Sequence, residues 1–189
     1  VLEAEIPSGL DSAERLFNGN FVEVTSQNYN PTFHVYSPDF KLLKSIPFTN
    51  PNPSYITDGQ FKKITPLKDG GFIAVWQDDR KDGDGYGIFA QRFDANTAKV
   101  GNEFQVNTTI TGAQLAPRVT GTEDGGFFVS WRSNTSTSQD SDTAVIGQFF
   151  NSDAAHLGGS NIINNNYNIS VFYIRNCIFN FIQLYVTHF

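Results

Sequence analysis

The sequence predicts an all-β protein built from about three four-stranded antiparallel units. First, the stretch 69-DGGFIAVW-76 recurs 55 residues later as 124-DGGFFVSW-131. Second, the residues after each Asp-Gly-Gly alternate from face to face with the two-residue period of a β-strand. Third, segments rich in Gly, Asn, Asp and Pro separate short apolar runs, which is typical of hairpins. Only 10-LDSAERLF-17 indicates a turn of helix.

Each unit is expected to contain four short strands. In 71-GFIAVWQ-77 both faces are apolar, as in a strand buried between two layers. The stretch 86-YGIFAQRFD-94 alternates in the same way and ends in the turn 94-DANTAKVG-101. The segments 103–108 and 117–122 are further short strands bounded by Gly, Pro and Asn. The Asp-Gly pairs predict tight turns, because glycine adopts positive φ without steric cost.

The repeats divide the chain into four parts. Residues 1–58 form a degenerate first unit, 59–113 the second unit, 114–160 the third unit, and 161–189 a divergent tail. In the first unit 18-NGNFVEVTS-26 matches the Asp-Gly-Gly-Phe start, with a threonine, Thr25, in place of the tryptophan.

A sheet of four short strands is too small to keep both of its faces dry, so we expect these units to stack. This pattern of recurring four-stranded units is typical of β-propeller blades. The aromatic residues expected to pack between neighbouring units are Trp76, Trp131, Phe72, Phe127, Phe93 and Phe149. Propellers close their ring with four to eight blades. Three units therefore predict a homo-oligomer or a larger parent assembly, because an open array leaves unpaired strand edges.

The tail 161–189 is rich in Asn, Ile, Phe and Tyr. The preferred interpretation is one or two further strands, at 169–174 and 181–186. The second is an error in the gene model, since the favoured residues have A/T-rich codons. The least favoured is a membrane anchor over 169–189, a stretch long enough to span a bilayer. It contains four polar residues that are costly in hydrocarbon: Arg175, Asn176, Asn180 and Gln183.

Composition limits the compartment and the partners. The net charge of −6 argues against nucleic-acid binding, which needs clustered basic residues. The single cysteine, Cys177, rules out an internal disulfide and a cysteine-cluster zinc site. Since the chain has no methionine, we interpret it as a processed or partial chain, most simply an exported one. Three Asn-X-Ser/Thr sequons fit glycosylation outside the cell: Asn107, Asn134 and Asn168.

The best candidate site is the acidic loop 78-DDRKDGDGYG-87. It offers four carboxylates as hard oxygen ligands for calcium, the one candidate cofactor: Asp78, Asp79, Asp82 and Asp84. The alternative is a solvated hairpin loop whose aspartates form local turns. The spacing does not match an EF-hand, which needs a glutamate at its twelfth position.

No catalytic residues are predicted. The sequence has no Gly-X-Ser-X-Gly elbow, no His-Glu-X-X-His and no P-loop. The chain is therefore not expected to be an enzyme. The alternative is a glycoside-hydrolase-type propeller, in which aspartates from different units converge.

The units resemble tandem repeats of the form DGGFVVxW…GxxAQRFDAxGxKVGxEFQVNT, found in large secreted or surface proteins of bacteria and some protists. The resemblance rests on 69–76, 87–96, 99–108 and 124–131. It implies propeller-like β modules, often next to calcium-dependent adhesion regions, and no established activity. Thr97 departs from the family pattern, which has a turn glycine there.

Together these observations predict an extracellular or cell-surface module with a structural or adhesive role that assembles with copies of itself. The alternative is a carbohydrate-binding, lectin-like propeller, which calcium would assist. In that case exposed Tyr86 or Trp side chains and the loop aspartates would hold glycans.

Overall fold

A computed structural model describes residues 13–27, 30–47, 61–79, 81–134 and 143–164. The regular secondary structure of these residues consists of β-strands, without helices. The strands form three four-stranded antiparallel sheets. The predicted all-β class and the four-stranded antiparallel units are confirmed. The 10–17 segment differs from expectation: Glu14 and Arg15 form a short strand instead of a helical turn, because they pair with the strand that follows.

Within each sheet, strands that are consecutive in the sequence are hydrogen-bonded neighbours. The first sheet comprises β1 (Glu14–Arg15), β2 (Phe21–Gln27), β3 (Asn30–Tyr36) and β4 (Leu42–Pro47). The second sheet comprises β5 (Phe61–Pro66), β6 (Phe72–Asp78), β7 (Gly87–Phe93) and β8 (Lys99–Gln105). The third sheet comprises β9 (Ala113–Gly121), β10 (Phe127–Asn134), β11 (Thr143–Phe150) and β12 (His156–Asn164).

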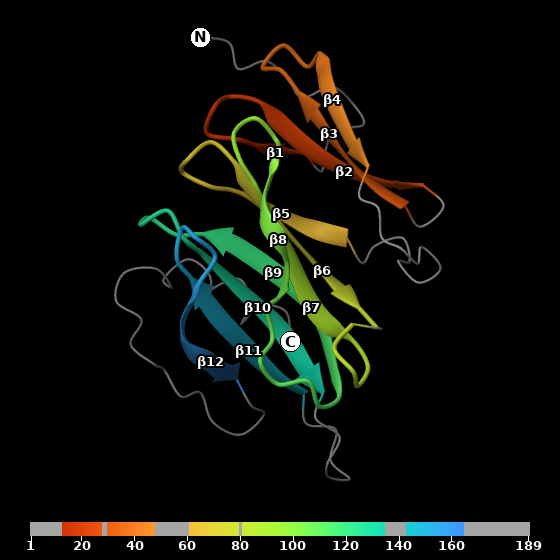
Figure 1. Ribbon diagram of the computed structural model, residues 1–189, viewed down its shortest axis with the longest axis vertical. Helices are drawn as coiled ribbons and strands as arrows, with labels where there is room; N and C mark the ends of the chain where they lie inside the picture. Colours follow the sequence, from red (N-terminus) through yellow and green to blue (C-terminus); the bar gives the residue numbers. More distant parts are fainter. Residues whose placement is uncertain (1–12, 28–29, 48–60, 80, 135–142, 165–189) are drawn as a thin grey trace.

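Each sheet is a simple meander of antiparallel neighbours, the arrangement of a propeller blade. The sheets follow one another in space, with the second sheet between the other two (Figure 1). Strand β12 ends four residues beyond the predicted end of the third unit at 160. The rest of the predicted tail, 165–189, lies outside the described residues.

The Asp-Gly-Gly motif builds the turn between β5 and β6. The Asp69 carboxylate accepts a hydrogen bond from the Gly71 N–H at 3.0 Å, which closes a local turn. Gly70 has φ = +88°, a conformation that favours glycine. A Cβ on Gly71 would lie 2.1 Å from the Phe93 carbonyl oxygen. The same three roles recur at 124–126, so the motif is explained by the geometry of the turn.

Two apolar clusters hold the sheets together. The first joins sheets one and two, and at its centre Phe33 contacts Phe72 and Phe93 at centroid distances of 5.8 and 5.2 Å. The second joins sheets two and three, and Phe127 stacks on Phe150 at 4.8 Å. The two strand faces of β6 are divided between the clusters, which is why both faces of this strand are apolar.

The two tryptophans occupy matching positions. Trp76 is buried in the first cluster and Trp131 in the second, each turned toward the preceding sheet. Such burial of a large aromatic side chain stabilises a core by several kcal/mol. Stacking of small sheets on their near-copies is therefore the main source of the hydrophobic core.

One prediction about the core is wrong. The sequence predicts Phe149 between the sheets, but Phe150 fills that place and aligns with Phe93 in the repeat. Since side chains alternate along a strand, Phe149 points to the opposite face, where its ring lies 4.4 Å from that of Phe128.

Candidate functional site

The connections between strands are of two kinds. At one end of every sheet, tight turns join the first to the second strand and the third to the fourth. We call this the turn end. At the other end, the second strand is joined to the third, in the second sheet by the acidic segment between Asp78 and Gly87, and we call this the loop end. The turn ends of neighbouring sheets contact each other: the Asn18 side chain donates to the Ala95 carbonyl at 3.3 Å, and Lys68 donates to the Glu123 carbonyl.

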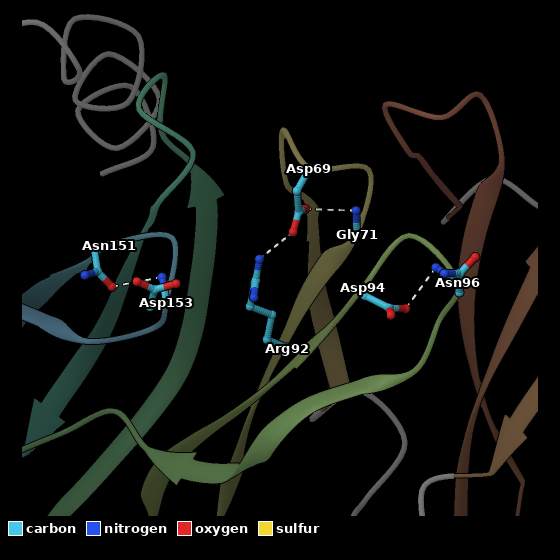
Figure 2. Close-up of polar contacts among 7 residues, drawn as sticks. All are labelled: Asp69, Gly71, Arg92, Asp94, Asn96, Asn151 and Asp153. Atoms are coloured by element: carbon cyan, nitrogen blue, oxygen red, sulfur yellow. Dashed lines mark hydrogen bonds and ion pairs between the residues drawn. The ribbon is translucent and has the colours of Figure 1, made fainter.

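Polar side chains at the turn end are occupied by local bonds (Figure 2). Asp94 accepts hydrogen bonds from the N–H groups of Asn96 and Ala98 at 2.9 and 2.8 Å. Asn151 makes the equivalent pair of bonds in the third sheet. Asp69 also forms an ion pair with Arg92, as Figure 2 shows. These residues shape the turns and do not surround a common space.

Two carboxylates at the turns have lowered pKa values. The pKa of Asp124 is lowered mainly by a hydrogen bond from the Thr122 hydroxyl and, to a smaller extent, by one from the Gly126 N–H. The Ser37 hydroxyl lowers the pKa of Asp39 in the same way. Both carboxylates are exposed, and the cause of both shifts is a hydrogen bond within a turn. They therefore mark turn geometry rather than a reactive group.

The predicted acidic loop lies at the loop end of the second sheet. Asp82 is 6% exposed, and its two carboxylate oxygens accept hydrogen bonds from the Asp84 N–H at 3.2 Å and the Asn107 side chain at 3.4 Å. Gly87 makes room for this carboxylate, since a Cβ there would lie 2.7 Å from it. Asp82 thus faces inward, toward the segment between β8 and β9.

The other loop aspartates point to different partners. Asp84 accepts a hydrogen bond from the Gly112 N–H at 3.1 Å, which ties the loop to the segment before β9. Asp78 lies 3.7 Å from the Lys81 ammonium group. Asp79, the next residue in the sequence after Asp78, is partly buried. The carboxylates of Asp82 and Asp84 therefore both bond to the segment between β8 and β9, while Asp78 pairs with Lys81.

Sequence reasoning missed the centre of this region, a buried amide pair. Asn107 is 4% exposed, accepts from the Ile88 N–H at 2.7 Å and donates to Gln114 at 3.0 Å. Gln114 in turn donates to the carbonyls of Thr111 and Gly112. The Asn in the FQVNT end of the repeat was the available signal, but it was assigned to glycosylation alone.

The three predicted sequons differ in environment. A glycan on Asn107 would replace hydrogen bonds of a buried amide, whereas Asn134 is exposed at the end of β10. Asn168 lies outside the described residues.

Both carboxylate oxygens of Asp82 and one of Asp84 accept a hydrogen bond from an N–H donor. Among the described residues, no three His, Cys, Asp or Glu side chains are grouped as metal ligands. His34 is bonded instead to two hydroxyl groups, those of Thr25 and Ser45. Calcium binding remains a prediction.

The fold and the geometry of these ends define a class: an all-β repeat protein of stacked four-stranded sheets. No protein-family model and no curated protein matches the chain. Among solved structures it is similar to the endo-arabinase from Bacteroides thetaiotaomicron VPI-5482, with a TM-score of 0.43 and 14% sequence identity. The match covers 80% of this chain and 60% of the endo-arabinase chain. Within the described residues no helix is long and apolar enough to cross a membrane.

Proposed function

We propose that this chain is an extracellular structural or adhesive repeat module that acts through its surface and assembles with copies of itself. One observation carries the proposal: the recurring residues of the motif are used for architecture. Asp69, Gly70 and Gly71 form a turn, and Trp76 fills an inter-sheet core.

The recurring glutamine supports the same conclusion. Gln91 is buried, and its amide donates to the backbone carbonyls of Arg92, Val100 and Gly101. Gln148 makes the matching bonds in the third sheet. Both amides lie where the register of the strand pairing shifts, as at a β-bulge. Because the repeated residues maintain the stack of sheets, we assign the interactions with partners to the other residues on the surface.

The experiment is sedimentation of the purified chain over a range of concentrations, together with binding to the surfaces of intact cells. We expect oligomers at high concentration and saturable retention on cells. A chain that stays monomeric contradicts the assembly part, and a chain that is not retained contradicts the adhesive part.

The second candidate is a carbohydrate-binding module, assisted by calcium at the acidic loop. The observation that favours it is that Asp84 is exposed and Tyr86 is partly exposed on the same loop. Aromatic faces and carboxylates are the groups that commonly hold sugars in such loops. Binding on a glycan array that is lost on chelation and in Tyr86→Ala would support this candidate. Hydrolysis of a bound glycan would instead support the glycoside-hydrolase alternative.

A further inference from the structure

The third sheet has a face turned away from the second sheet. Phe127, Val129 and Trp131 belong to the core shared with the second sheet, so the alternate residues point outward. Strand pairing places the outward residues in one patch, which we call the outer face of the third sheet: Phe128, Ser130, Val145, Gly147, Phe149 and Leu157. Phe128 and Phe149 pack ring against ring, and Leu157 lies opposite Phe149. The exposed fraction of this face rises from its middle to its edge: Ser130 is 4% exposed, Phe128 9% and Leu157 48%.

The same positions in the other two sheets receive the next sheet of the stack. Val22, Ile73 and Phe128 each follow, by three residues, the turn glycine with φ of +87° to +89°. Val22 is fully buried against the second sheet, and Ile73 is fully buried against the third. The outer face of the third sheet therefore continues an interface that the molecule already uses twice.

The opposite end of the stack has a different chemistry. The face of the first sheet turned away from the second sheet has Glu23 and Thr25 where the third sheet has Val129 and Trp131. His34 lies between two hydroxyls, at 2.8 Å from Thr25 Oγ1 and 2.9 Å from Ser45 Oγ. These polar groups satisfy one another, and covering them with an apolar sheet would cost desolvation energy. The outer face of the first sheet thus combines these polar groups with the stacked rings of Phe21 and Phe40, whereas that of the third sheet presents Phe128 and Phe149.

We infer that the outer face of the third sheet is a docking surface for a further four-stranded sheet of the same repeat. The partner is a sheet whose buried face carries the pattern Phe-X-Ala/Val-X-Trp, as at 72–76 and 127–131. The stack then extends from the third sheet, on the side away from the second sheet. This inference deepens the assembly part of the proposed function, on which it rests, by naming the face and the chemistry of its partner.

The test duplicates residues 109–164 and inserts the copy after Asn164 of the full chain. Leu157→Cys in the first copy, with Cys177→Ser, reports the accessibility of the outer face through its rate of maleimide labelling. We expect the duplicate to slow labelling at least tenfold and to raise the melting temperature. A matched duplicate with Glu and Thr at the positions of Val129 and Trp131, as in the first sheet, should give no protection.

A second reporter, Leu42→Cys, lies on β4 and is 50% exposed, so the duplicate should not change its labelling. Equal labelling of the Leu157→Cys reporter with and without the duplicate overturns the inference. Slow labelling already in the natural chain also overturns it, because the face is then covered by the chain itself. If the duplicate protects the face while the natural chain sediments as a monomer, the docking surface stands and only self-assembly fails.

Discussion

Gly71 lies against the carbonyl oxygen of Phe93, so close that a Cβ at position 71 would be 2.1 Å from that oxygen. Neither backbone can move easily, because Phe72 and Phe93 are stacked at 4.6 Å directly beside the contact. The second glycine of the Asp-Gly-Gly motif is therefore required by a contact between two strands.

We expect Gly71→Ala to lower the free energy of unfolding by about 3 kcal/mol, the upper range for forcing extra atoms into a packed site. Urea denaturation measures this change. The control is Gly159→Ala, because a Cβ at position 159 meets nothing within 4 Å. Equal losses in the two variants would contradict the steric explanation.

Thr97 has φ = +64°, in the left-handed region that disfavours β-branched residues. Its hydroxyl is also buried without a hydrogen-bond partner. We expect Thr97→Gly to stabilise the fold by about 1 kcal/mol, because strain of this kind costs about 1–3 kcal/mol and glycine loses part of the gain through its flexible unfolded state. Thermal denaturation measures the change.

Phe40 supplies the contrast to Thr97. It has φ = +60° at the equivalent turn of the first sheet, but its ring stacks on Phe21 at 4.9 Å. Phe40→Gly should therefore gain less than Thr97→Gly or destabilise the fold. A larger gain at position 40 would show that backbone strain is not the deciding term at position 97.

Asn107→Ala should destabilise the fold by about 2 kcal/mol, because the buried Ile88 N–H loses its acceptor. Chemical denaturation measures the change. Asn134→Ala, at an exposed position, is the control and should change the stability by less than about 0.5 kcal/mol. An unchanged free energy of unfolding in Asn107→Ala would mean that water replaces the hydrogen bonds of the lost amide.

The same two residues predict a pattern of modification. When the chain is secreted from eukaryotic cells, we expect a glycan on Asn134 and none on Asn107, since only the first side chain is exposed. Mass spectrometry of peptides before and after enzymatic deglycosylation checks this. Full occupancy of Asn107 would show that its amide is exposed long enough during folding to be modified.

The lowered pKa of Asp124 predicts a small dependence of stability on acid pH. Because the folded pKa lies below the unfolded one, the carboxylate contributes stability above the unfolded pKa of 3.8. That contribution is lost as pH falls through the folded pKa. Wild type should therefore exceed Asp124→Asn in melting temperature at pH near 6, and the difference should fade below about pH 3.

Thr122→Ala supplies the control, because it removes the hydroxyl that is the main cause of the shift. Its acid sensitivity should be smaller than that of the wild type. A constant difference between wild type and Asp124→Asn at all pH values would assign the effect to packing instead of ionisation.

Much of the fold is predictable from local sequence. Alternation in 71–77 predicts a strand with two buried faces, and the structure divides those faces between two clusters. The Asp-Gly turns are predictable as well, since an Asx turn and a positive φ are properties of a few adjacent residues. The choice of Phe150 over Phe149 was also available from the sequence, because Phe150 follows Gln148 by two residues as Phe93 follows Gln91.

The candidate site was less predictable. The loop aspartates were visible as a cluster, but their partners come from distant segments: Asn107 lies 25 residues from Asp82, and Gly112 lies 28 residues from Asp84. The outer face of the third sheet was also missed, since a face is defined only when neighbouring sheets are placed.

The sequence by itself determined the repeat, the strands and the tight turns, because these follow from side-chain alternation and from the backbone preferences of adjacent residues. The tertiary structure alone decided what the loop carboxylates bind and which sheet faces end the stack. The physical reason is that hydrogen bonds and apolar contacts between sheets join residues far apart in the chain, and their partners are fixed only when the sheets pack.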